Sequence, residues 1–152
     1  MASFKEQIVF DVTGWTESER AELLAAHTAV QNKRAAAAAA DEQAAHGGWT
    51  GASRTLLLSR LTAAGANVVA QSFAAALASG GYVTRDKVYE LGNYPADRVL
   101  KGFTRPINRI VAEMRASGEI PSDAVDPFVP AYDQVTGRAI GFRVAPEIVA
   151  LG

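Results

Sequence analysis

The stretch TRPINRIVAEMRAS, residues 104–117, has the strongest helical pattern in the chain. Pro106 fits the first turn of such a helix, because its missing N–H would have no partner inside the helix there. Gly118 follows and is a natural stop. Four large apolar residues recur at the spacing of one helix face: Ile107, Ile110, Val111 and Met114. The pattern predicts a helix that packs this face into a core.

The opposite face of the predicted helix is narrow and basic. It carries Arg105 and Arg109, flanked by Asn108 and Arg115, with alanines at positions 112 and 116. Arginine presents a planar fork that suits guanine or a phosphate, and asparagine suits adenine. The small alanines would let the helix approach a groove closely. In the alternative interpretation the face is only solvated, with Arg109 paired to Glu113 one turn later.

Two short segments after this helix have the pattern of a β-hairpin. They are FVPAY, residues 128–132, and AIGFRV, residues 139–144, and DQVTGR joins them. Gly137 suits the positive φ angle that a tight connection requires. Arg138 follows it, so the pattern predicts an arginine at the tip of the hairpin.

Capping residues and glycines divide the rest of the chain into short elements. Thr16 and Glu19 form a capping-box pattern, which predicts a helix running from there to about residue 45. Ser53, Asn67 and Thr84 are expected to cap three further helices, which end near residues 65, 80 and 91. Shorter elements are expected as strands over 7–12 and 82–83, one helical turn over 96–101, and a last half-turn in PEIVALG.

The helix predicted up to residue 45 is rich in alanine and poor in large apolar side chains. Such a helix either packs through small residues against a partner or projects as a weakly packed arm. Both interpretations stay open at this point. The resulting division is an N-terminal strand and helix over residues 1–52, as a candidate dimerisation arm, and a folded domain over 53–152.

Charge and composition restrict the classes of function. The formal net charge is −1, but residues 81–118 hold seven cations against four acids, a local excess of +3. Lys87, Arg98 and Lys101 in this segment are candidates for contacts with phosphates. The chain has no cysteine, which excludes disulfides and thiolate metal sites and is compatible with the cytoplasm. It has no apolar run long enough for a bilayer and no basic-then-apolar leader.

The order of elements after residue 67 resembles the winged helix-turn-helix family. The resemblance rests on SGGYVTRDKVYEL for a strand and second helix, TRPINRIVAEMRASGEI for the third helix, and FVPAYDQVTGRAIGFRV for the wing. It covers about half of the chain. One departure is the connection over residues 92–103, twelve residues long where a compact motif has about three or four.

The resemblance implies a fold that is mainly α with a small β-hairpin, an α+β winged helix-turn-helix domain preceded by a helical extension. It also implies a third helix in the DNA major groove and a wing on the backbone. The candidate DNA-binding residues are then Lys101, Arg105, Asn108, Arg109, Arg115 and Arg138.

We therefore expect a transcriptional regulator that binds double-stranded DNA, forms a homodimer through its N-terminal helices and has no membrane contact. The alternative is a module of the same fold that binds another protein and no DNA. An enzyme is not expected, because His27 and His46 lack metal-ligand spacing and no phosphate-binding glycine loop occurs. Accordingly, no catalytic residue, metal or cofactor is assigned.

Overall fold

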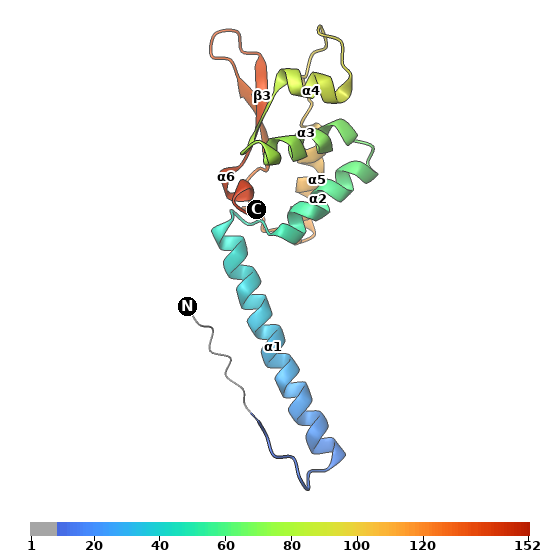
Figure 1. Cartoon of the computed structure of the whole chain (residues 1–152), viewed down its shortest axis with the longest axis vertical. Coiled ribbons are helices and arrows are strands. Elements are labelled where there is room, and N and C mark those ends of the chain that lie inside the picture. The colour runs from blue at the N-terminus through green and yellow to red at the C-terminus, as the bar shows by residue number, and fades with distance from the viewer. Residues whose placement is uncertain (1–8) are drawn as a thin grey trace. The chain divides into compact units, whose positions relative to one another are not determined.

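Residues 9–152 are described by a computed structural model, and helix α1 (Glu17–Ala45) is their first regular element (Figure 1). Its start follows the predicted capping box. The Thr16 backbone N–H donates to Glu19 Oε2 at 2.7 Å, and the Glu19 N–H donates to Thr16 Oγ1 at 3.2 Å. None of the 29 residues of α1 is buried. No helix within residues 9–152 is long and apolar enough to cross a bilayer.

The strand predicted over residues 7–12 is wrong for its second part. Residues 9–12 form no strand, and the side chains of Val9 and Phe10 are largely exposed. Residues 7 and 8 lie outside the described residues. Alternating apolar residues stabilise a strand only where a neighbouring strand pairs with it and one face is covered. Residues 9–12 have neither a pairing strand nor a covered face.

The chain divides into two compact units, one ending at Ala38 and one over Ala39–Gly152. The boundary expected from the sequence followed residue 52 instead. In the second unit Trp49 is fully buried, and its indole N–H donates to the carbonyl of Val125 at 2.9 Å. His46 Nδ1 also lies 2.8 Å from the carbonyl oxygen of Glu147. The loop before residue 52 is therefore packed into the second unit.

Two helices follow this loop, α2 (Gly51–Ala63) and α3 (Asn67–Ala78). Ser53 was expected to be the N-cap of the first, but Thr50 has that role. The Ser53 N–H donates to Thr50 Oγ1 at 3.1 Å, and the Thr50 N–H donates to Ser53 Oγ at 2.9 Å. Ser53 thus closes a reciprocal capping box from inside the first turn.

Strand β3 is the centre of a three-stranded antiparallel sheet, in the order β1-β3-β2. The strands are β1 (Tyr82–Thr84), β2 (Phe128–Tyr132) and β3 (Ala139–Val144). Phe142 of β3 is paired with Val83 on one side and Pro130 on the other. The hairpin is confirmed, and both of its strands begin and end at the predicted residues. The third strand of the sheet, β1, comes from the short stub predicted at residues 82–83.

Helices α4 (Arg85–Gly92), α5 (Arg105–Ala116) and α6 (Pro146–Val149) complete the second unit. Thr84 caps α4 as predicted, accepting from the backbone N–H of Lys87 at 3.1 Å. The helical turn predicted over 96–101 is wrong: the connection 93–104 consists of turns and irregular backbone and contains no helix. Asn93, at φ 48°, and Gly102, at φ 77°, both turn the backbone out of helical geometry here.

The core lies between the helices and the inner face of the sheet. Helix α5 packs on α2, while α4 packs on α3, β1 and β3. Phe73, Phe128 and Phe142 are in contact across the core, with ring centroids 5.5 and 5.4 Å apart. The predicted inward face of α5 is confirmed, because its four large apolar residues are all buried: Ile107, Ile110, Val111 and Met114.

Candidate nucleic-acid interface

Three of the predicted residues lie exposed on the outer face of α5: Arg105, Asn108 and Arg109. The expected pair of Arg109 with Glu113 is present, with 3.9 Å between Nε and Oε1 and both side chains more than half exposed. An ion pair this long in water contributes little. The guanidinium of Arg109 therefore remains free to bind an anion.

Arg105 occupies the first position of α5, at the positive end of the helix dipole. The first turn contains no acidic residue to offset it, and a cation is unfavourable there. Its side chain lies against Gly102, since a Cβ built on Gly102 would come within 2.8 Å of Arg105 Nε. Lys101 directly precedes Gly102 in the chain, so both cations belong to the stretch in which α5 begins.

Arg115 differs from the other α5 arginines. Its guanidinium donates to the carbonyl oxygen of Ala124 at 2.6 Å and to Asp126 Oδ1 at 2.9 Å, and only 28% of its side chain is exposed. Arg115 therefore fixes the segment after α5. Helical spacing could not indicate this, because the partners lie in a loop that folds back on the helix.

The hairpin turn has an ordered tip. Asp133 Oδ1 accepts hydrogen bonds from the backbone N–H groups of Val135 and Thr136 at 2.9 and 2.7 Å. These bonds, with the strongest contribution from Thr136, lower the pKa of the Asp133 carboxyl. Gly137 has a positive φ of 64°, as predicted. Arg138 is exposed next to it, so the turn presents the arginine on a fixed backbone.

Arg85, which sequence reasoning did not select, joins three segments near the hairpin. Its guanidinium donates to Tyr89 Oη at 2.7 Å from Nε, and to the carbonyl oxygens of Ala139 and Arg98 at 3.4 Å. Tyr89 Oη in turn donates to the carbonyl of Arg98. The only signal in the sequence was an arginine directly after the capping Thr84.

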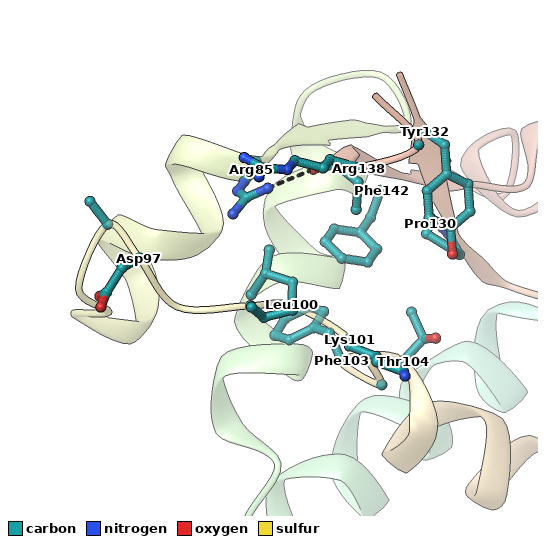
Figure 2. Close-up of a pocket in the computed structure, with 15 residues that line it drawn as sticks. Arg85, Asp97, Leu100, Lys101, Phe103, Thr104, Pro130, Tyr132, Arg138 and Phe142 are labelled. Carbon is teal, nitrogen blue, oxygen red and sulfur yellow. Dashed lines mark hydrogen bonds between the residues drawn. The ribbon is translucent and has the colours of Figure 1, made fainter. Parts of the chain in front are cut away.

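A cavity of about 600 Å³ lies between the connection 93–104 and the hairpin (Figure 2). It brings together Lys101 from the connection, Arg138 from the hairpin turn and Arg85 from α4. Lys101 and Arg138 are the two predicted site residues that line it, and the other four do not: Arg105, Asn108, Arg109 and Arg115. The candidate interface thus has two parts, the outer face of α5 and a basic cavity beside its first turn.

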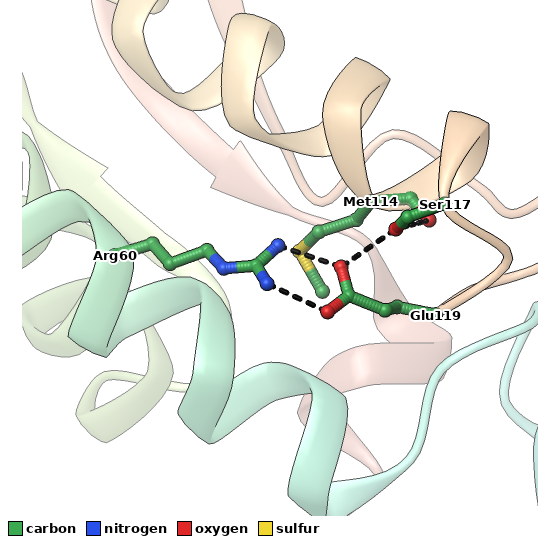
Figure 3. Close-up of polar contacts among 4 residues, drawn as sticks. All are labelled: Arg60, Met114, Ser117 and Glu119. Atoms are coloured by element: carbon green, nitrogen blue, oxygen red, sulfur yellow. Dashed lines mark hydrogen bonds and ion pairs between the residues drawn. The ribbon is translucent and has the colours of Figure 1, made fainter.

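An ion pair links α2 to the segment that directly follows α5 (Figure 3). Arg60 donates through both Nη atoms to the two carboxylate oxygens of Glu119, each at 2.6 Å. The Ser117 hydroxyl lies 2.8 Å from Glu119 Oε2. The hydrogen bonds from Arg60 and then from Ser117 lower the pKa of Glu119 below its ordinary value of 4.5.

We expect Glu119→Gln to lower the Tm at neutral pH. A carboxylate with a lowered pKa contributes stability that is complete above pH 4.5 and is lost as the pH falls through the folded pKa. The difference in Tm between wild type and variant should therefore shrink below pH 4.5. Thermal unfolding followed by circular dichroism over a pH series measures this. Glu113→Gln is the matched control, and an equal loss in both variants would contradict the assignment.

Comparisons with protein-family models, curated proteins and solved structures gave no significant match to this chain. Residues 9–152 also contain no group of three or more His, Cys, Asp or Glu that could hold a metal ion.

Proposed function

We propose that the protein binds double-stranded DNA as a winged helix, with the outer face of α5 in the major groove and the β2–β3 hairpin on the backbone, and that it acts as a transcriptional regulator. The observation that carries the proposal is the position of Arg105. A cation at the positive end of a helix, with no acid in the first turn, costs stability. Such a placement has a physical reason if a phosphate or a base edge binds there.

The order of elements supports this proposal. In the succession α3, β1, α4, α5, β2, β3, with sheet order β1-β3-β2, the two-stranded hairpin β2–β3 follows α5, which is the order expected for a wing. The long connection before α5 departs from a compact helix-turn-helix, and α2 supplies the packing surface for α5 instead. Because α2 packs on the inner face of α5, the outer face of α5 stays exposed.

The residues divide into two roles in this proposal. Arg109 and Asn108 lie beyond the first turn of α5 and would contact base edges. Lys101, Arg105 and Arg138 are placed around the start of α5 and the hairpin turn, and they would contact phosphates. Because the net charge of the chain is −1, attraction to DNA depends on this local group of cations. Helix α1, with no buried residue, would pair with a second copy in a homodimer.

Anisotropy of a fluorescein-labelled duplex over a salt series tests the proposal. Each neutralised phosphate adds about −0.9 to the slope of log K against log salt concentration, so the three cations assigned to phosphates give a slope of roughly −2.7. We expect binding at 50 mM salt that weakens steeply by 200 mM. Absence of binding at the lowest salt, with specific or random duplexes, would overturn the proposal.

A second candidate function is binding to another protein, and the apolar surface of the hairpin favours it. The side chain of Val135 at the turn is 93% exposed, and three further apolar residues on the strands are also exposed: Val129, Tyr132 and Ile140. Apolar side chains gathered on one exposed hairpin are typical of a contact surface. A protein that binds no duplex at low salt but forms a defined complex through this hairpin would fit this second function.

A further inference from the structure

The cavity beside the start of α5 has an apolar floor. Leu100, Phe103 and Phe142 line it, and the ring centroids of the two phenylalanines are 4.9 Å apart. Figure 2 shows these three side chains grouped between the connection and the hairpin. The volume of about 600 Å³ lies within the range of sites that hold small organic molecules. An apolar floor of this size favours an aromatic or aliphatic body over an inorganic ion.

The charged residues around this floor are mainly cations. Lys101, Arg138 and Arg85 line the cavity, against Asp97 as the one acid in the lining. In the described part of the chain, none of the three cations forms an ion pair with a carboxylate. The lining therefore keeps a net charge of +2, from three cations and one acid (3 − 1), and this charge attracts an anion into the cavity.

Arg85 is held in place before any ligand arrives. All its partners are neutral, namely the hydroxyl of Tyr89 and the carbonyls of Ala139 and Arg98. Neutral acceptors fix the orientation of a guanidinium and leave its full charge. A pre-oriented arginine loses less side-chain entropy when it binds a carboxylate.

We infer that this cavity binds a small organic anion, an aromatic or aliphatic body bearing a carboxylate or sulfonate. The apolar body lies on Phe103 and Phe142, and the acid group faces the cations of the rim. This inference goes beyond DNA binding, because the ligand site needs no DNA and does not include Asn108 or Arg109. The two sites share Lys101 and Arg138, so a bound anion would weaken DNA binding.

The probe is 1-anilinonaphthalene-8-sulfonate, an aromatic sulfonate whose fluorescence rises in an apolar site. We expect saturable binding to the full chain without DNA, and a loss of affinity of about tenfold or more in a Lys101→Ala, Arg138→Ala double variant. The matched control is Lys33→Ala with Arg34→Ala, which removes two exposed charges from α1 and should leave the affinity unchanged. Ala96→Trp, at an exposed lining residue, should also reduce binding by filling the cavity.

Competition separates charge from apolar contact. 2-Naphthoate should displace the probe, and 2-naphthalenemethanol, which has the same ring system without the charge, should displace it at least tenfold less well. Equal displacement by the two compounds, or unchanged probe affinity in both the double variant and Ala96→Trp, would overturn the inference. Because fluorescence is measured without DNA, a failed duplex experiment leaves this result intact, and a failed probe experiment leaves duplex binding intact.

Discussion

Replacing Arg105 and Arg109 together with alanine is expected to weaken binding to a DNA duplex by on the order of 100-fold. A good arginine contact contributes about 1–3 kcal/mol, and loss of the phosphate contact of Arg105 also reduces the magnitude of the salt slope by roughly 1. Anisotropy of the labelled duplex at two salt concentrations measures both effects. The loss should be larger at low salt, where electrostatic attraction is strongest.

The same double substitution should leave folding intact. Arg105 lies at the unfavourable end of the helix dipole with no acid beside it, and the contact of Arg109 with Glu113 is 3.9 Å long and exposed. Alanine also has a higher helix propensity than arginine. We therefore expect an equal or slightly higher Tm, which separates lost contacts from lost structure.

Two controls sharpen this experiment. The Lys33→Ala, Arg34→Ala variant removes the same charge from α1 and should bind the duplex with unchanged affinity. Asn108→Ala should change the preference between duplex sequences more than it changes the salt slope, because an amide carries no charge. If the Arg105, Arg109 double variant bound the duplex with full affinity, this would show that α5 is not part of the DNA interface.

Local patterns in the sequence were enough to predict most elements. The helix over 104–117 and the hairpin strands follow from periodicity and turn residues, and both occur with nearly the predicted bounds. The Thr16 and Thr84 caps were also predictable, because each cap and its partner lie within three residues. Such signals depend only on neighbouring residues, which is why they are readable without a structure.

Contacts between distant segments were not predictable from these patterns. The pairing of β1 with β3, the bonds of Arg115 to the following loop and the position of Arg85 all depend on how the chain returns on itself. For the site, the exposed α5 residues could be found by helical spacing. The cavity could not, because residues from α4, the connection and the hairpin form it only after folding.

Replacing Trp49 with alanine is expected to have the largest effect on stability. Trp49 has no exposed surface, and its indole N–H donates to the carbonyl of Val125 at 2.9 Å. Truncating a buried tryptophan costs about 3–5 kcal/mol, against a typical total stability of about 5–15 kcal/mol. Thermal unfolding followed by circular dichroism should show a large fall in Tm or an unfolded chain at room temperature.

Trp15→Ala is the matched control, because Trp15 is the other tryptophan of the chain and is partly exposed in the first unit. Its Tm should equal that of the wild type. Trp49→Phe keeps an aromatic ring but leaves the Val125 carbonyl without its partner, so its loss of stability should be smaller, about 1–3 kcal/mol.

The same reasoning predicts that a fragment over 39–152 folds, while one over 53–152, which lacks Trp49 and the Thr50 cap, does not. A stably folded 53–152 fragment would show that Trp49 is dispensable and that the core is complete without it.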